Sequence, residues 1–538
     1  MAAEAASDRE LEWQLEAQDL RLVLRWLEVV AEGAAGVTIE PGRTVTHVDT
    51  YVDTADRRLD RAGFSVRLRR SRGEAPEATL KSLDGARPDA LRIRLELAER
   101  VGLDDPSAVA LAPGPVGGRV RSLVGSRKLV PLFDLQTRRR SFALAANGVP
   151  SGELLLDETA IRAHEGAILS RLHRVEVEVP ERATEVVAPF IESLQSACGL
   201  QPAALSKYEA GLAASGQRRA DAPSFGPTSV DPADTIGQVA LATLRRQFAV
   251  LLAKEAGTRI GDDVEELHEM RVANRRLRAA VALFGDALPA DAERLRPELA
   301  WIGQTIGAVR DLDVQLLQLD EWTKILDEPD REPLARLRAL LVEEREQARA
   351  QMLQALDSAR YERFVRRFGA MLRTRTGTRT PAARSVAPDL VERRHRSVRK
   401  AMKRIGDDTG DAAYHRVRIA GKRFRYALEF LSDVYPGETK PLIRRTAALQ
   451  DLLGAYQDGH VAIVRLRELA TQRADDLGPA AVFAMGEIAE RYRVAMVDLR
   501  GRVRPAYARL NGKQWRRTRT VLEAERPPAT PASGPVDV

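Results

Sequence analysis

Two short segments of the chain place a histidine and several basic residues at helical spacing. In residues 268–278 four side chains recur every three or four positions and therefore share one helix face: His268, Arg271, Arg275 and Arg278. Residues 415–425 repeat the pattern 147 positions later with His415, Arg418, Lys422 and Arg425. Guanidinium and ammonium groups gathered on one face bind phosphate oxygens. The spacing therefore predicts two helix faces that bind a polyanion.

The opposite faces of these segments are apolar and repeat at the same offset. The matching apolar residues are Met270, Ala273 and Leu277 in the first segment and Val417, Ala420 and Phe424 in the second. The match continues from 306–314 to 453–461, which indicates a duplicated helical unit. We expect the two basic faces to meet in one site. Three acidic residues are expected to hold the basic side chains in place, namely Asp311, Asp313 and Asp458.

These segments resemble the conserved-histidine helical domain called CHAD, whose halves each carry a His-x-x-Arg-x-x-x-Arg/Lys-Arg-x-Arg helix. The resemblance covers roughly the C-terminal half and implies binding of inorganic polyphosphate through the eight residues of the two faces. One alternative is that the arginines only form a solvated helix surface. Metal binding by His268 and His415 is disfavoured, because their neighbours on the helix are cations. Donation to phosphate oxygens fits better.

The N-terminal third alternates polar and apolar residues, which is typical of half-buried strands. Eight such segments are found, at 9–15, 44–53, 64–70, 77–82, 91–98, 132–142, 152–160 and 172–179. They predict an α+β domain in which an eight-stranded antiparallel sheet closes into a barrel with flanking helices. Charged residues share one face of most strands, as Arg67 with Arg69 and Arg138 with Arg140 do. A polar lumen is therefore expected.

The strands resemble the CYTH, or triphosphate tunnel metalloenzyme, family over residues 8–212. The matching landmarks are Glu10-x-Glu12, Tyr51-Val52-Asp53-Thr54, Arg67-x-Arg69, Thr79-Leu80-Lys81, Leu156-Asp157, Arg174-Val175-Glu176-Val177-Glu178 and Ser206-Lys207-Tyr208. The resemblance implies hydrolysis of inorganic triphosphate or a short polyphosphate with Mg²⁺ or Mn²⁺. Its implied metal ligands are Glu10, Glu12, Glu96, Asp157, Glu176 and Glu178. Its implied triphosphate-binding residues are Arg67, Arg69, Lys81, Arg94, Arg138, Arg140 and Lys207, with Glu10, Glu12 and Lys81 as catalytic residues.

Two positions depart from the family pattern. Gln14 stands where the family has lysine, and it cannot offset phosphate charge. Ala98 stands where the family has a second glutamate, which removes one carboxylate. These departures leave open a non-catalytic polyphosphate-binding protein with a degenerate tunnel. A cyclase acting on ATP belongs to the same barrel family and also stays open.

The 538 residues are expected to divide into a tunnel domain (1–212), a linker (213–234), an all-α domain (235–520) and a disordered tail (521–538). The all-α domain is expected to hold two four-helix-bundle-like halves, about 235–373 and 389–510, with separate helices at 439–457 and 459–473. Cys198 is the one cysteine, and neither a signal peptide nor an apolar span is found, which favours the cytoplasm and no membrane. Aromatic residues make up 5% and do not interleave the basic faces, which argues against nucleic acid.

Overall fold

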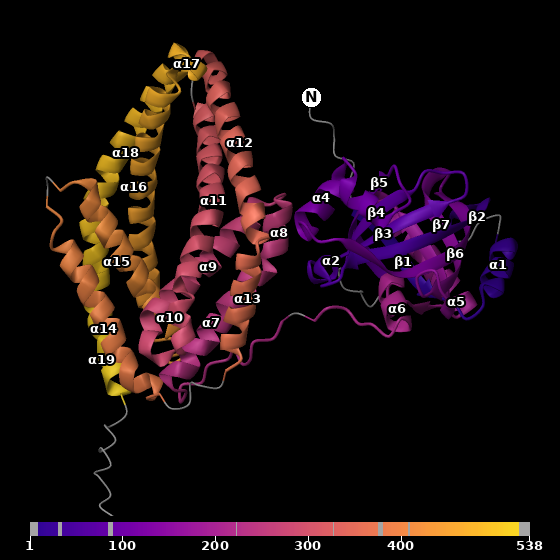
Figure 1. Ribbon diagram of the computed structural model, residues 1–538, viewed down its shortest axis with the longest axis horizontal. Coiled ribbons are helices and arrows are strands. Elements are labelled where there is room, and N and C mark those ends of the chain that lie inside the picture. Colours follow the sequence, from indigo (N-terminus) through magenta and orange to yellow (C-terminus); the bar gives the residue numbers. More distant parts are fainter. Residues whose placement is uncertain are drawn as a thin grey trace, which may run out of the picture. The chain divides into compact units, whose positions relative to one another are not determined.

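The computed structural model describes residues 9–30, 35–83, 90–221, 223–325, 328–374, 380–406 and 409–526, with only the backbone at 9, 10, 325 and 328–330. The chain forms two compact units, Met1–Ala222 and Pro223–Val538. Figure 1 shows strands wrapped around one another in the first unit, drawn in indigo and violet, and only helices in the second. Each unit is described by itself.

The strands of the first unit form a closed ring. Their bounds are β1 (Arg9–Glu16), β2 (Val37–Thr54), β3 (Phe64–Ser71), β4 (Glu77–Ser82), β5 (Leu91–Arg100), β6 (Leu129–Ala146), β7 (Val149–Arg162), β8 (Ile168–Val179) and the short β9 (Gln201–Pro202). The order β5-β4-β3-β2-β6-β7-β8-β1 is closed by pairing of β1 with β5, and all pairs are antiparallel. The predicted eight-stranded antiparallel ring is confirmed.

Strand alternation separates an apolar outer face from a polar lumen. On β1, Leu11, Trp13 and Leu15 are buried against the helices α1 (Leu20–Val29) and α5 (Thr184–Cys198). The residues between them face the lumen, because side chains of a strand alternate between its two faces. The other helices of this unit are α2 (Arg58–Arg61), α3 (Pro106–Leu111), α4 (Pro115–Val124) and α6 (Lys207–Ala214).

The second unit is a duplicated set of helices. The first half contains α7 (Ile236–Ala253), α8 (Glu255–Ile260), α9 (Val264–Phe284), α10 (Ala290–Arg294), α11 (Arg296–Ile325), α12 (Glu328–Leu356) and α13 (Ala359–Leu372). The second half contains α14 (Ala383–Met402), α15 (Asp411–Phe430), α16 (Lys440–Gln472), α17 (Ala474–Leu477), α18 (Pro479–Asn511) and α19 (Lys513–Ala524). Thr235 and Ala382, equivalent at the 147-residue offset, pair with each other in an antiparallel bridge. Such a self-matching contact is expected where two copies meet about a pseudo-twofold axis.

In each half, two packed helices contact each other through one amide side chain and one glycine, and the two halves place these residues on opposite helices. Asn274 on α9 lies where a Cβ on Gly303 of α11 would come within 2.6 Å of its amide nitrogen. At the equivalent positions the roles are exchanged, since Gly421 lies on α15 and Gln450 on α16, with 2.4 Å between the corresponding atoms. Both amides donate to a backbone carbonyl of the facing helix. One amide and one glycine thus set the close approach of each helix pair.

The segment predicted as a linker, 213–234, is partly packed on both units. Helix α6 continues to Ala214, and the Ala220 amide donates to Asp60 at 2.7 Å. Phe225 packs on Phe248 in the helical core. Of the predicted tail, residues 521–524 complete α19, and residues 527–538 lie outside the described part. Among the described helices, none combines the length and apolar character needed to cross a membrane.

Candidate functional site

The ring encloses a charged cavity of about 170 Å³. Its acidic lining residues are Glu12, Glu77, Glu96, Glu176 and Glu178. Its basic lining residues are Arg67, Arg69, Lys81, Arg94, Arg139 and Lys207. Uncharged residues complete the wall, namely Gln14, Tyr51, Ser65, Leu83, Ser206 and Tyr208. The lumen thus places carboxylates and cationic groups of several strands around one space.

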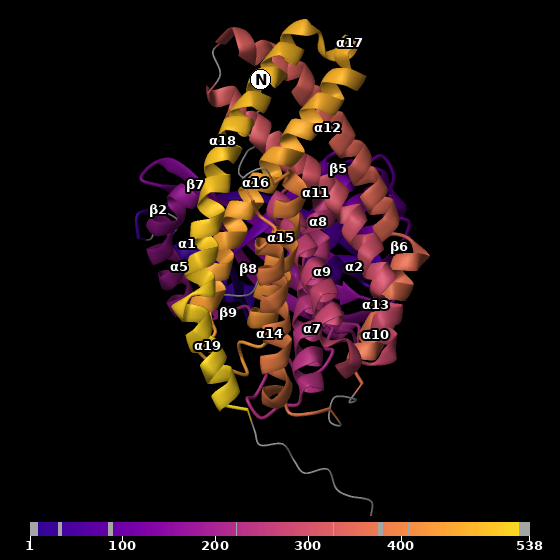
Figure 2. The same cartoon turned by 90° about the vertical axis from the view of Figure 1, so that its left-hand side faces the viewer.

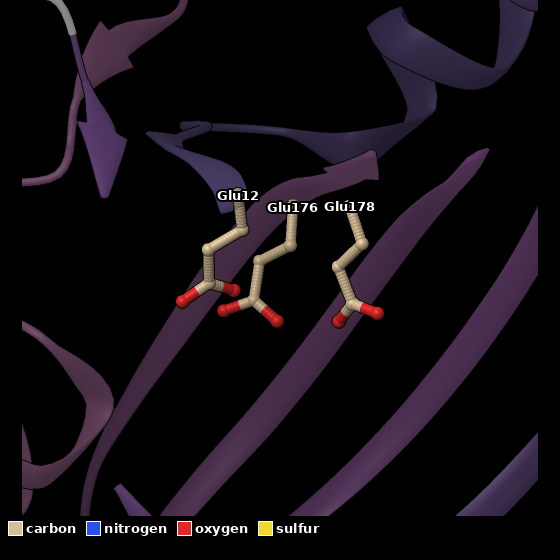
Figure 3. A group of neighbouring side chains, drawn as sticks. All are labelled: Glu12, Glu176 and Glu178. Carbon is tan, nitrogen blue, oxygen red and sulfur yellow. The ribbon is translucent and has the colours of Figure 1, made fainter. Parts of the chain in front are cut away.

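Three carboxylates from two neighbouring strands form the acidic end of the lumen. Glu12 lies on β1 and is the cross-strand partner of Glu178 on β8, while Glu176 lies two residues before Glu178. One carboxylate oxygen of each lies within 4.8 Å of the others, and Figure 3 shows the three carboxylates pointing the same way. Like charges at paired positions destabilise a sheet unless they are compensated. Such a set of oxygen ligands suits Mg²⁺ or Mn²⁺.

The three carboxylates differ in the hydrogen bonds and ion pairs that they form with neighbouring side chains. Glu12 forms an ion pair with Arg94 and accepts a hydrogen bond from the Gln14 amide nitrogen. Burial would raise the pKa of Glu176, but Lys207 and Arg139 outweigh it and hold that pKa far below its usual value. Burial raises the pKa of Glu178, for which the described part of the chain offers no hydrogen bond or ion pair. Glu178 therefore has its carboxylate available for a ligand.

Asp49 fixes two of the basic side chains. Arg69 donates to both of its oxygens, at 2.8 and 2.9 Å, and Arg67 lies at 3.4 Å. Burial would raise the pKa of Asp49, but Arg67 and Arg69 lower it well below its usual range. Glu96 connects Arg67, at 3.5 Å, to Lys81, at 2.8 Å. This network positions the guanidinium forks before any ligand arrives.

Asp157 likewise holds two basic side chains of the lumen in place. It is fully buried and pairs with Lys207 and with Arg139, whose terminal nitrogen lies at 2.7 Å. Both cations also contact Glu176, at 2.8 and 3.0 Å. Lys207 reaches the lumen because it is the first residue of α6, whose start is fixed by a capping box at Ser206. Asp157, a predicted metal ligand, is thus occupied by two cations.

The prediction that Arg138 and Arg140 face the lumen is wrong. Arg138 is exposed and pairs with Glu158, and Arg140 lies on the outer face over Phe142. Arg139, between them, is the lumen residue. A shift of one position exchanges the two faces of a strand. The sequence held a signal for this assignment, because the apolar Phe142 shares the outer face with both arginines.

The remaining predicted tunnel residues fall into three groups. The structure brings Glu12, Glu96, Glu176, Glu178, Arg67, Arg69, Lys81, Arg94 and Lys207 into the lumen. The side chain of Glu10 lies outside the described residues, although its backbone pairs with Arg94. Ala98 is exposed. Asp49 and Arg139 were missed, and Asp49 follows the same alternation as Tyr51 two residues later.

The basic helix faces of the second unit come together between α9 and α15. The two helices are in contact and run next to each other up the middle of the unit in Figure 2. Arg271 pairs with Asp311 at 2.9 Å, and Arg275 donates to the Tyr426 hydroxyl at 2.7 Å. On α15, the buried Nε of Arg418 has no acceptor among the residues that the structure describes.

Lys422 shows how closely these cations approach one another. Burial, together with Arg418, Arg275 and Arg271, lowers the pKa of Lys422 to about 7. The Lys422 ammonium has no hydrogen bond or ion pair to any described residue. Burial raises the pKa of Asp458, which faces Arg418 and Lys422. Arg271, Arg275, Arg418 and Lys422, named here the basic cluster, form a positive site in which Arg271 is paired with Asp311 and Asp458 lies near Arg418 and Lys422.

The other residues predicted for this site are arranged differently. Arg278 is exposed, and Arg425 is held by Glu429 at 3.1 Å. His268 is half-buried, and its Nδ1 has no hydrogen-bond partner in the described part of the chain. Burial and the nearby Arg310 lower the pKa of His268. Arg310 is a cation of this site that was not predicted from the sequence. His415 is exposed and bonds Gln457 at 2.7 Å. The expectation for Asp313 is wrong, because it binds Arg345 at 2.7 Å.

The closed ring and its charged lumen define a triphosphate tunnel fold, and the second unit is a duplicated helical domain. Family models agree with both: the CYTH domain matches residues 25–211 and the CHAD domain matches residues 242–467. The chain therefore carries a CYTH domain followed by a CHAD domain. CYTH domains depend on a metal ion, and the acidic cluster of the lumen offers ligands for one.

Several solved structures are similar to parts of the chain. The CHAD domain from the plant Ricinus communis is 31% identical, with 52% of this chain and 93% of that chain covered and a TM-score of 0.46. PptA from Streptomyces chartreusis is 24% identical over 51% of this chain and 99% of its own, with a TM-score of 0.43. A Hippeastrum protein with a dominant triphosphatase activity is 18% identical over 39% of this chain and 96% of its own, with a TM-score of 0.29. No curated protein matches the chain.

Proposed function

We propose that the tunnel hydrolyses inorganic triphosphate or a related short polyphosphate with a divalent cation, Mg²⁺ or Mn²⁺. The observation that carries this proposal is a single lumen that joins a three-carboxylate cluster to a wall of basic side chains. The carboxylates suit a hard cation, and guanidinium and ammonium groups suit phosphate oxygens. A phosphate chain bridging the two would satisfy both sets of charges.

The residues of the wall have distinct tasks in this proposal. Arg67, Arg69 and Arg139 would bind the non-bridging oxygens and stabilise the charge that moves onto the leaving phosphate. Their carboxylate partners hold them in place, so little reorganisation is needed during the reaction. A divalent cation held by the glutamate cluster would orient the attacking water and polarise the terminal phosphoryl group.

For the helical unit we propose binding of long-chain inorganic polyphosphate. The supporting observation is the basic cluster, in which Arg418 Nε and the Lys422 ammonium have no hydrogen-bond partner among the described residues and lie near Arg271 and Arg275 of the other half. A flexible phosphate chain offers an acceptor at every unit, so its affinity sums over several salt-sensitive contacts. Uncompensated, half-buried cations are costly without such a ligand.

A binding-only tunnel is the second candidate, and one observation favours it. Glu12 is engaged by Arg94 and by Gln14, which replaces the lysine of the family. A carboxylate neutralised in this way contributes less to cation binding. Both units would then hold the phosphate chain without cleaving it.

Phosphate release separates the two candidates. The purified protein is assayed with tripolyphosphate, ATP and thiamine triphosphate, each with Mg²⁺, with Mn²⁺ and with chelator. Cation-dependent release that is lost in Glu178→Gln but kept in Glu158→Gln, a change on the outer face, supports hydrolysis. No release from any substrate, with salt-sensitive polyphosphate binding intact, supports the binding-only tunnel.

The basic cluster is tested in parallel. The double change Arg271→Glu with Arg418→Glu should abolish polyphosphate binding and leave the tunnel activity in place. Arg416→Glu is the matched control, because Arg416 is exposed on the same helix. Equal loss in the control, or binding that survives the double change, contradicts the assignment.

A further inference from the structure

Gln14 lies in the wall of the tunnel beside the carboxylate cluster. It follows Glu12 by two residues on the same face of β1, and it is the cross-strand partner of Glu176 on β8. Its side chain is 4% exposed. The amide nitrogen donates to Glu12 Oε1 at 2.6 Å, while the amide oxygen is buried and accepts a hydrogen bond from none of the described residues. A buried carbonyl oxygen without a hydrogen-bond donor destabilises the folded chain, so a missing partner is indicated.

The geometry limits where that oxygen can lie. The two polar atoms of a carboxamide are about 2.2 Å apart by covalent geometry. The amide oxygen of Gln14 therefore lies within about 5 Å of Glu12 Oε1. Glu12 belongs to a cluster whose ligand oxygens lie within 4.8 Å of one another. A cation with bonds of about 2.0–2.6 Å joins oxygens separated by about this distance.

We propose that Gln14 is a neutral oxygen ligand of the divalent cation held by Glu12, Glu176 and Glu178. The inference rests on the cation site of the proposed function and adds a residue of this chain to it. Amide carbonyls are ordinary ligands of hard cations. Through its nitrogen, Gln14 also holds the Glu12 carboxylate in place, so one side chain supplies a ligand and orients another.

The identity of residue 14 sets the charge of the site. A lysine here would add one more ammonium group beside carboxylates that Arg94, Arg139 and Lys207 already contact, and would weaken cation binding. Glutamine removes that charge and supplies an oxygen, so the site favours cation binding over direct neutralisation of phosphate. The cation should therefore bind this chain without a phosphate ligand.

Binding of Mn²⁺ to the full-length protein, followed by electron paramagnetic resonance of the free ion, tests the inference. Gln14→Met keeps a similar volume without the oxygen and should weaken Mn²⁺ binding about tenfold. Gln14→Lys should weaken it further, whereas Gln14→Glu should strengthen it. Gln136→Met, on an exposed residue of β6, is the control and should have no effect. Binding of normal affinity in both Gln14→Met and Gln14→Glu overturns the inference.

Glu178→Gln separates failure of the inference from failure of the proposed function. If Glu178→Gln weakens Mn²⁺ binding while Gln14→Met and Gln14→Glu do not change it, the cation site stands and the role of Gln14 fails. If wild-type binding is absent or insensitive to Glu178→Gln, the cation site itself fails and the inference falls with it. Circular dichroism at each step shows that the variants are folded, and Gln14→Glu serves as the test if Gln14→Met is not.

Discussion

Polyphosphate binding by the helical unit should weaken as the pH rises through 7, because Lys422 must be protonated to bind phosphate. Burial and its arginine neighbours lower the pKa of Lys422 to about 7 in the absence of a ligand. A bound polyanion favours the charged form, so the complex forms from the protonated fraction. That fraction falls from about nine-tenths at pH 6 to about one-tenth at pH 8. The apparent affinity should therefore fall about tenfold, and binding at pH 8 should take up about one proton.

Isothermal titration calorimetry at constant ionic strength measures both quantities, when it is repeated in two buffers with different heats of ionisation. Lys422→Arg keeps its charge at every pH, so it should remove both the proton uptake and the fall in affinity between pH 6 and pH 8, which is called the step below. His268 does not produce the step above pH 7, because its pKa is already lowered below the usual value by burial. Asp458→Asn removes a charge that raises the pKa of Lys422, so it should move the step to lower pH without removing it. An affinity independent of pH above 7, or a step that persists in Lys422→Arg, would refute the reasoning.

Three further outcomes are expected. Arg139→Ala should lower triphosphate hydrolysis about a hundredfold or more, whereas Arg138→Ala should change it less than about twofold, as measured by phosphate release. Gly152→Ala should destabilise the tunnel unit by about 2 kcal/mol in urea unfolding, because Gly152 has φ +141° and a Cβ would lie 2.1 Å from the Glu178 carbonyl. Burial lowers the pKa of His395 to about 4 in the folded chain, so stability that is complete above pH 6.5 should decrease as the pH falls toward 4. The loss is up to about 3 kcal/mol and should be absent in His395→Phe, as followed by the Tm against pH.

Local patterns in the sequence were sufficient to predict most of the strands and helices. Strand alternation predicted all eight strands of the ring, because burial of one face imposes a period of two. The 147-residue offset predicted the duplication that the Thr235 and Ala382 pairing displays. Helix continuity was harder to predict. Separate helices were expected on either side of residue 458, but α16 continues through Gly459. A Cβ at Gly459 would lie 3.2 Å from Met496 of α18, which explains why a glycine stands there. Gly459 allows close packing and does not end the helix.

Residue types also predicted most of the charged lumen, but strand register was decided in three dimensions. Arg138, Arg139 and Arg140 are chemically identical, so residue type alone could not say which one faces inward, although their alternation with the apolar Phe142 carried a signal. The outer apolar core around Phe142 fixed that choice. Asp49 was likewise invisible as a partner, because its role depends on two arginines of the neighbouring strand.

By itself the sequence determined the two domains, the strand and helix faces, and the kinds of charge those faces carry, because these properties depend on neighbours a few residues apart. Tertiary structure alone decided which charges are compensated. Within the described part of the chain, Glu178 and Lys422 have no hydrogen bond or ion pair, whereas Asp157 and Asp313 are paired with cations distant in sequence. The physical reason is that pairing and burial depend on contacts between separate elements, which fix both the distance between charges and their exposure to water.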